Sequence, residues 1–240
     1  RNITIVCNSS DLESFEKLLG SGEQFGINLK YSLQDNPDGI PDAIKVAIEE
    51  TNSEKFLVTL GDNFIFGSEF FGTLKNVVQN NNEIAIFSQW VKNPENFGII
   101  KKDINGKIKE LIEKPKEKVS NNAVIGLYLF DSKFIDHFKK INKSDRGETE
   151  IIDIMYQYGL DNLKCYELGR GTSWFDMGTV DSFYNCSSFV KTIQQRQGLL
   201  ICSPHEIAYR NDWISVNELE KYIFHIKGSE YSENLDLILK

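Results

Sequence analysis

The chain has 240 residues, a length that fits one large domain or two small ones. Hydrophobic residues make up 40% and charged residues 26%, so the chain can bury a core and is not intrinsically disordered. Its net charge of −8, without a basic tract, argues against a nucleic acid or an anionic membrane as the main partner. No apolar run approaches the ~20 residues that a membrane span needs, and no signal-peptide pattern opens the chain. The four cysteines are scattered without a C-x-x-C pair, which favours reduced thiols in a cytoplasm.

The first 90 residues alternate strand and helix patterns. Apolar runs predict strands at 3–7, 29–33, 56–60 and 84–91, and amphipathic stripes predict helices after a capping box at 10–13, after Pro41, and over 70–78. This alternation is typical of a parallel sheet that is covered by helices on both faces.

The pattern changes in the middle of the chain. Asn105-Gly106 predicts a hairpin between strands at 97–102 and 107–113, and a further strand follows at 122–130. Helices are expected at 133–140, 151–158 and 180–197, a strand at 163–168, a loop from 169 to 178, and a last capping box at Ser215. We therefore expect one α/β domain over 1–240, with a core over 1–178, a β-hairpin insertion, and a helical C-terminal extension over 179–240.

Two aspartates follow predicted strands. The strand at 56–60 runs into Gly61-Asp62-Asn63, which places a carboxylate at the edge where open α/β sheets bind ligands. Asp176 lies in the loop before the helix at 180–197. A hard cation such as Mg²⁺ could be held there together with phosphate oxygens, although a turn or a helix cap explains either residue alone.

Further polar candidates stand next to turns. Glu113-Lys114-Pro115 ends the hairpin, where the ammonium suits a phosphate and the carboxylate suits sugar hydroxyls, unless both are merely solvated. Gln34 carries an amide that matches the donor and acceptor of a thymine or uracil edge. The aromatic residues Phe97, Tyr128 and Trp174 are either ligand platforms or core. The three histidines show no partner pattern and are interpreted as surface or packing residues.

Together these segments resemble the sugar-phosphate nucleotidyltransferases, and within them the bacterial branch that transfers thymidylyl groups. The segments that carry the resemblance, nine in order, are Gln34 with Pro37-Asp38-Gly39, Leu60–Asn63, Phe97–Ile100, Glu113–Pro115, Asn122–Tyr128, Arg146–Asp153, Gly169–Gly171, Trp174–Thr179 and Arg196–Gly198. The resemblance implies a Rossmann-like nucleotidyltransferase sheet with helices on both faces.

The resemblance also implies roles for individual residues. Asp62 and Asp176 would hold Mg²⁺ and, with Lys114, act in catalysis. The nucleotide would be contacted by Gln34, Pro37, Gly39 and Asp62, and the sugar phosphate by Asn63, Gly98, Glu113, Lys114, Val124 and Trp174. A second, regulatory nucleotide site would lie near Arg170, Arg196, Gln197 and Gly198.

The implied reaction joins dTTP and glucose 1-phosphate to give dTDP-glucose and pyrophosphate, in a cytoplasmic homotetramer that feeds a dTDP-rhamnose or other deoxysugar pathway. Use of UTP or another sugar 1-phosphate, and a non-catalytic nucleotide-sugar-binding module, are the alternatives.

The sequence also departs from the family pattern. The family's first strand and glycine-rich loop would lie about 50 residues upstream of Arg1, so we expect an N-terminally truncated form that is inactive alone, since that loop cradles the triphosphate. Phe97 stands where a Tyr is common, and Met177 where a Thr is common.

Overall fold

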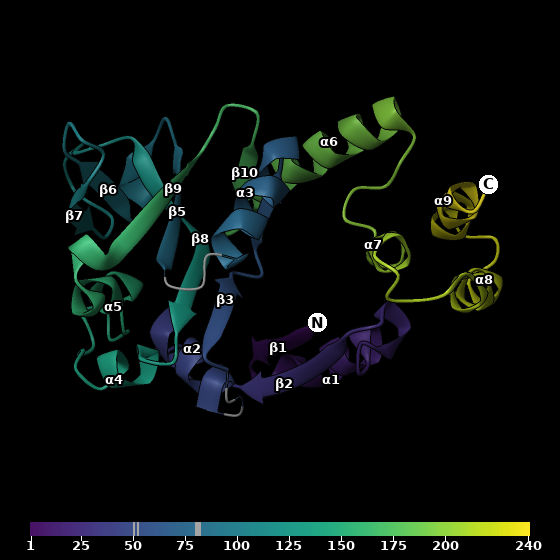
Figure 1. Ribbon diagram of the computed structural model, residues 1–240, viewed down its shortest axis with the longest axis horizontal. Helices are drawn as coiled ribbons and strands as arrows, with labels where there is room; N and C mark the ends of the chain where they lie inside the picture. The colour runs from purple at the N-terminus through teal and green to yellow at the C-terminus, as the bar shows by residue number, and fades with distance from the viewer. Residues whose placement is uncertain (50, 52, 80–82) are drawn as a thin grey trace. The chain divides into compact units, whose positions relative to one another are not determined.

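A computed structural model describes residues 1–49, 51, 53–79 and 83–240 (Figure 1). The contacts divide the chain into two compact units. Unit 1 comprises Arg1–Asn36 and Ser187–Lys240, and unit 2 comprises Pro37–Cys186. Each unit is described by itself, and the predicted domain division stays a prediction.

Unit 2 is built on a mixed sheet of six strands. Its strands are β3 (Lys55–Thr59), β5 (Ile84–Trp90), β6 (Ile99–Lys102), β7 (Ile108–Ile112), β8 (Asn122–Asp131) and β9 (Leu163–Leu168). The order is β7-β6-β8-β5-β9, and β3 pairs with β8 as well. β5 and β9 are parallel, whereas β3, β5 and β6 all run antiparallel to β8. The α/β class is confirmed. β3 and β5 run in the same direction, as the pattern of the first 90 residues predicts, but the long strand β8 lies between them in the opposite direction, so the sheet is mixed.

Helices cover both faces of this sheet, as predicted. One face packs against α2 (Ile40–Glu49), α4 (Phe134–Phe138) and α5 (Ile151–Tyr158), through a core that includes Ile86, Phe130 and Met155. The other packs against α3 (Ser68–Gln79), with Phe87 and Ile125 in its core. Alternate residues of β5 and β8 enter the two cores, so the sheet is buried on both sides, and this is why these strands are continuously apolar.

The predicted hairpin is confirmed. β6 and β7 pair antiparallel across the turn at Asn105-Gly106, and the φ of +80° at Gly106 is one that glycine adopts without strain. A second two-stranded sheet pairs β4 (Asn63–Phe66) with β10 (Ser173–Asp176). Both strands were missed: β10 lies inside the expected loop from 169 to 178. Four residues are too few for a periodicity to show.

Unit 1 combines two segments that are far apart in the sequence, Arg1–Asn36 and Ser187–Lys240. The parallel strands β1 (Asn2–Cys7) and β2 (Asn28–Leu33) are connected through α1 (Ser9–Leu19). The N-cap of this helix is Asn8, whose side chain accepts a hydrogen bond from the amide of Asp11, and not Ser10 of the expected capping box at 10–13.

The C-terminal part of unit 1 is helical. It follows α6 (Val180–Gln197), which begins in unit 2, and consists of α7 (Pro204–Arg210), α8 (Val216–His225) and α9 (Glu230–Ile238). The predicted capping box at Ser215 is present, and Leu219 and Leu235 lie in the core of this cluster. Among the described residues, no helix is both long and apolar enough to cross a membrane.

Candidate active site

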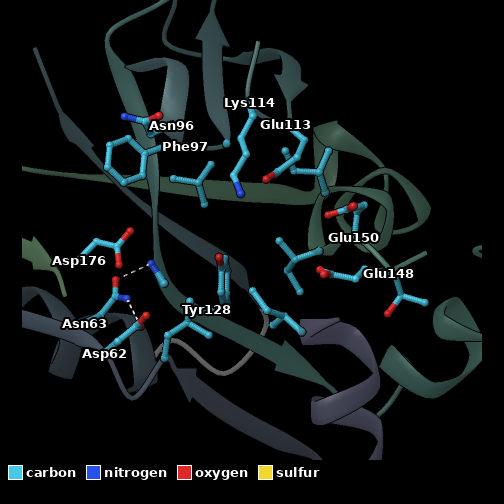
Figure 2. A pocket seen from close by; sticks show the side chains of 18 of the residues that line it. Asp62, Asn63, Asn96, Phe97, Glu113, Lys114, Tyr128, Glu148, Glu150 and Asp176 are labelled. Carbon is cyan, nitrogen blue, oxygen red and sulfur yellow. Dashed lines mark hydrogen bonds between the residues drawn. The ribbon is translucent and has the colours of Figure 1, made fainter. Parts of the chain in front are cut away.

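A cavity of about 240 Å³ opens in unit 2 at the junction of the hairpin, β8 and β10 (Figure 2). Eight of the residues to which the resemblance gave a role line it, Asp62, Asn63, Gly98, Glu113, Lys114, Val124, Trp174 and Asp176, together with the candidate platforms Phe97 and Tyr128. Figure 2 shows Asn63 between Asp62 and Asp176 on one side, with Lys114 and Glu113 on the opposite side. Segments far apart in the sequence thus meet at one cavity.

The pairing of β4 with β10 brings the two aspartates together. Asn63 lies opposite Asp176 in the register, and the amide of Met177 donates to the carbonyl of Asp62 at 2.9 Å. Burial raises the pKa of Asp176, and the charge of Asp62 raises it further. A divalent cation bound by both carboxylates would relieve the repulsion between Asp62 and Asp176. This pair of oxygen donors therefore fits Mg²⁺.

Lys114 reaches the cavity from an unusual backbone conformation. Its φ is +40°, which is uncommon for a residue with a side chain, and Pro115 follows directly. The amide of Lys114 donates to the carbonyl of Phe97 at 3.2 Å, which closes the open end of the hairpin. Such strain is typical of residues whose side chain must point in one direction.

Glu113 lies in an acidic neighbourhood. Burial raises its pKa, and the charge of Glu150 adds to this effect. Arg146 offsets part of it: its guanidinium bonds Glu150 at 2.7 Å and lies 3.8 Å from Glu113. Ser144 donates a further hydrogen bond of 2.7 Å to Glu150. The carboxylate of Glu113 is therefore placed beside a fixed Arg–Glu pair.

Carboxylates outnumber cations in the described lining of the cavity. The acidic side chains are Asp62, Asp176, Glu113, Glu148 and Glu150, and the basic ones are Lys114 and Arg146. An anionic phosphate would meet net repulsion there unless a metal cation accompanied it.

The residues that are predicted to contact the sugar line another part of the cavity. A Cβ at Gly98 would be crowded, because it would lie 3.2 Å from side-chain atoms of both Glu113 and Ile152. The Trp174 ring packs on Phe97 with centroids 5.0 Å apart. Val124 and Tyr128 come from β8, and burial, with a smaller contribution from Glu113, raises the pKa of the Tyr128 phenol.

Of the predicted nucleotide residues, Asp62 lines the cavity, whereas Gln34, Pro37 and Gly39 do not. Gln34 follows β2 in unit 1, where its backbone N–H donates to the backbone carbonyl of Cys7 at 2.9 Å. Pro37 and Gly39 belong to unit 2. The carbonyl of Asp38, between them, accepts from the amide of Thr149 at 2.8 Å and from its hydroxyl at 2.7 Å. Since Thr149 lines the cavity, the Pro-Asp-Gly turn is tied to the cavity wall.

The predicted regulatory residues are exposed and belong to different units. Arg170 is in unit 2, whereas Arg196, Gln197 and Gly198, at the end of α6, are in unit 1. The regulatory site and the tetramer stay predictions.

Several lining residues had no assigned role in the sequence. Asn96, Ile152 and the cluster of Arg146, Glu148 and Glu150 belong to this group. In the sequence, this cluster is a run of charged residues directly before an apolar helix. Such a run is also typical of a solvated helix start, so it did not indicate a site.

Comparisons with known proteins give this cavity a context. The family model described as Nucleotidyl transferase matches residues 1–193, most of the chain. The chain belongs to this nucleotidyl transferase family. It is 36% identical over 242 residues to the glucose-1-phosphate thymidylyltransferase of Xanthomonas campestris pv. campestris, with all of this chain and 82% of the relative covered. It is 37% identical over 236 residues to the enzyme of that name from Mycolicibacterium smegmatis, with 98% of this chain and 82% of the relative covered.

Solved structures of the family share the fold. A Bacillus anthracis structure described as a glucose-1-phosphate thymidylyltransferase in complex with a sucrose superposes with a TM-score of 0.69 at 31% identity, covering 78% of this chain and 75% of that one. A UDP-glucose pyrophosphorylase complexed with UDP-glucose gives a TM-score of 0.66 at 19% identity, covering 80% of this chain and 81% of that one, and shows the fold alone. The predicted family membership and fold are confirmed, and nucleotidyl transfer is the chemistry of this family.

Proposed function

We propose that the chain transfers a thymidylyl group from dTTP to glucose 1-phosphate and releases pyrophosphate. The observation that supports this best is the cavity, in which two adjacent aspartates lie across from Lys114 and Glu113 (Figure 2). The names of the relatives, which cover the whole chain, supply the nucleotide and the sugar.

The reaction is an in-line displacement. An oxygen of the glucose 1-phosphate dianion forms a bond to the α-phosphorus of dTTP, while the bond to the bridging oxygen of the leaving pyrophosphate breaks. The attacking phosphate is already deprotonated near neutral pH, so no general base is needed. The protein's task is to align two anions and to balance their charge.

Each side of the cavity has a part in this alignment. Lys114 would grip the phosphate of glucose 1-phosphate, and Glu113 would accept hydrogen bonds from glucose hydroxyls. Gly98, Val124 and Trp174 would form the wall against the sugar ring. Gln34, Pro37 and Gly39 would contact the nucleotide, with the side-chain amide of Gln34 at the edge of the thymine base.

Asp62 and Asp176 are the residues that would hold Mg²⁺. The ion, when bound, neutralises phosphate charge that the carboxylate-rich lining alone would repel.

The test compares nucleotides and sugars directly. Formation of nucleotide sugar and pyrophosphate is measured for dTTP and UTP, each with glucose 1-phosphate or galactose 1-phosphate, with Mg²⁺ and with a chelator. We expect the highest kcat/KM for dTTP with glucose 1-phosphate and no turnover with the chelator. A higher kcat/KM for UTP would assign the uridylyl reaction instead. Binding of dTDP-glucose without turnover in either direction would assign a non-catalytic binding module.

A further inference from the structure

The side chain of Asn63 links three parts of the cavity. Its Oδ1 accepts a hydrogen bond from the indole Nε1 of Trp174 at 2.6 Å and another from the backbone amide of Gly126 at 3.2 Å. Its Nδ2 donates to Oδ1 of Asp62 at 2.8 Å. The dashed lines in Figure 2 show the bonds that reach the Asn63 side chain among the residues drawn there.

The orientation of this amide follows from chemistry. An indole N–H and a backbone N–H are donors only, so the atom of Asn63 that faces both must be the carbonyl oxygen. The amide nitrogen then necessarily points to the carboxylate of Asp62. The two bonds to Oδ1 use both of its lone pairs, and one hydrogen of Nδ2 is left beyond the bond to Asp62.

β8 is shaped to admit this side chain. A Cβ at Gly126 would lie 3.0 Å from Oδ1 of Asn63 and 2.6 Å from two atoms of Leu60. Only a residue without a side chain lets the Leu60–Asn63 segment approach β8 closely enough for the bond to Gly126 to form. Gly126 is itself part of the cavity lining, in the middle of a fully buried stretch of β8.

We propose that Asn63 is a positioning residue that fixes the carboxylate of Asp62 and the ring of Trp174 relative to one another. This deepens the proposed function and rests on it, since it takes Asp62 as a cation ligand and Trp174 as the sugar wall. Asp62 is exposed, and an exposed carboxylate otherwise rotates freely. The bond from Nδ2 holds one oxygen, which leaves the other directed away from the amide. Metal-binding carboxylates commonly depend on such hydrogen-bonding partners.

The first test measures both ends of this link. Mn²⁺ replaces Mg²⁺ as a probe, and its binding to the chain in the presence of dTDP-glucose is measured by electron paramagnetic resonance. In parallel, the chain is labelled with 5-fluorotryptophan, so that its three tryptophans each give a ¹⁹F signal without any ligand. For Asn63→Ala we expect Mn²⁺ affinity to fall by about 10-fold or more, and the Trp174 signal alone to shift.

The second test uses Trp174→Phe, which keeps an aromatic ring and removes only the indole donor. In a chain with Asn63 it should weaken Mn²⁺ binding, because Asn63 loses its anchor. In the Asn63→Ala background the same change should add little, since the two side chains act through one link. This variant also keeps the proposal testable if Asn63→Ala does not fold, as judged by circular dichroism.

Asn105→Ala, in the exposed hairpin turn, is the matched control and should bind Mn²⁺ like the unaltered chain. If Asn63→Ala keeps Mn²⁺ affinity within twofold and an unshifted Trp174 signal but loses affinity for glucose 1-phosphate, Asn63 is a substrate contact and the proposal is wrong. If the effects of Asn63→Ala and Trp174→Phe add fully, the link between them is wrong. If the unaltered chain binds no Mn²⁺, the cation site assumed in the proposed function is wrong, and the positioning role of Asn63 toward that site is wrong as well.

Discussion

His205 is the most deeply buried titratable side chain of unit 1, with 2% of its surface exposed. Its ring stacks on Tyr222 with centroids 3.6 Å apart, and its Nδ1 bonds the hydroxyl of Tyr231 at 2.9 Å. Nε2 is buried and has no hydrogen-bond partner among the described residues. Burial lowers the pKa of His205 to about 4, so the imidazole is neutral in the folded chain. The sequence interpretation of a packing histidine agrees with this environment.

The buried neutral ring predicts a pH-dependent stability. The unfolded chain binds a proton at His205 below about pH 6.5, whereas the folded chain does so only near pH 4, so stability is lost as the pH falls through this window. At pH 5 the loss should be about 2 kcal/mol relative to pH 8. Urea unfolding at both pH values measures it. His205→Phe should remove most of the difference, while His225→Gln, at an exposed site, should leave it unchanged. Equal pH profiles for His205→Phe and the unaltered chain would contradict the assignment.

The adjacent carboxylates predict the effect of Asp176→Asn. Removing this charge should lower Mg²⁺-dependent turnover of the complete gene product by at least about 100-fold. The melting temperature should stay the same or rise, because the repulsion from Asp62 disappears. Asp181→Asn, exposed in the first turn of α6, is the control and should affect neither quantity. Normal kinetics for Asp176→Asn would remove this residue from the metal site.

The amide of Gln34 predicts a nucleotide-specific effect. Gln34→Ala should weaken dTTP binding by roughly 1–3 kcal/mol, as expected for the loss of hydrogen bonds to a base edge, and should hardly change glucose 1-phosphate binding. Isothermal titration with each ligand measures both. An equal loss for the two ligands would mean that Gln34 supports the fold instead of reading the base.

Residues that stand at a strand end or a turn could be predicted from the sequence, whereas residues that act through neighbours could not. Asp62, Lys114 and Gly98 fall in short recognisable motifs, and all three line the cavity. Arg146 matters because it bonds Glu150 and approaches Glu113 from another segment. No local pattern records such a contact.

At the level of elements, the turn before α2 gives a prediction from backbone geometry. Gly39 has a φ of +103°, and a Cβ there would lie 2.2 Å from the carbonyl oxygen of Thr149. Gly39→Ala should therefore destabilise the chain by about 1–3 kcal/mol, displace the turn from Thr149, and lower turnover. Thermal unfolding and kinetics measure the two effects.

The matched control is Gly72→Ala, in the interior of α3. A Cβ at Gly72 meets nothing within 4 Å, and an alanine in a helix is favoured over glycine. This variant should be more stable by about 0.5–1 kcal/mol. A result in which both glycine variants change stability by the same amount and sign would contradict the role assigned to the Gly39 turn.

Long elements could be predicted well, and short ones could not. The range of α6 agrees at both ends with the predicted helix at 180–197. β4 and β10, with four residues each, are stabilised by their pairing and not by their own pattern. The first helix begins at Ser9, because the side chain of Asn8, and not that of Ser10, accepts the hydrogen bond from the backbone amide of Asp11.

At the scale of the molecule, the strands and α6 should differ widely in local stability. β8 pairs with neighbours along both edges, and its residues from 123 to 130 are all buried. α6 has one buried residue, Cys186, in eighteen. Hydrogen exchange followed by mass spectrometry should therefore show α6 amides exchanging orders of magnitude faster than those of β8. Comparable protection in both would show that α6 is held by contacts outside those described here.

The fold class could be predicted from the sequence, but the place of β8 in the sheet could not. Alternating strand and helix patterns correctly indicate an α/β sheet that is covered on both faces. Whether two strands run parallel depends on which of them are neighbours, and β8 lies between β3 and β5 although it follows both in the chain. The local sequence pattern of β8 does not show between which strands it is inserted.

The chain crosses between the two units twice, after Asn36 and after Cys186. Unit 1 is therefore made of two segments that are separated in the chain by the whole of unit 2. Unit 2 is continuous, so all of its partners are available as soon as Cys186 has been synthesised. The strands β1 and β2 must wait for the helices α7 to α9 throughout that time. Vectorial synthesis thus lets the cavity-bearing unit close before residues 187–240 are made, and residues 1–36 stay without those partners until then.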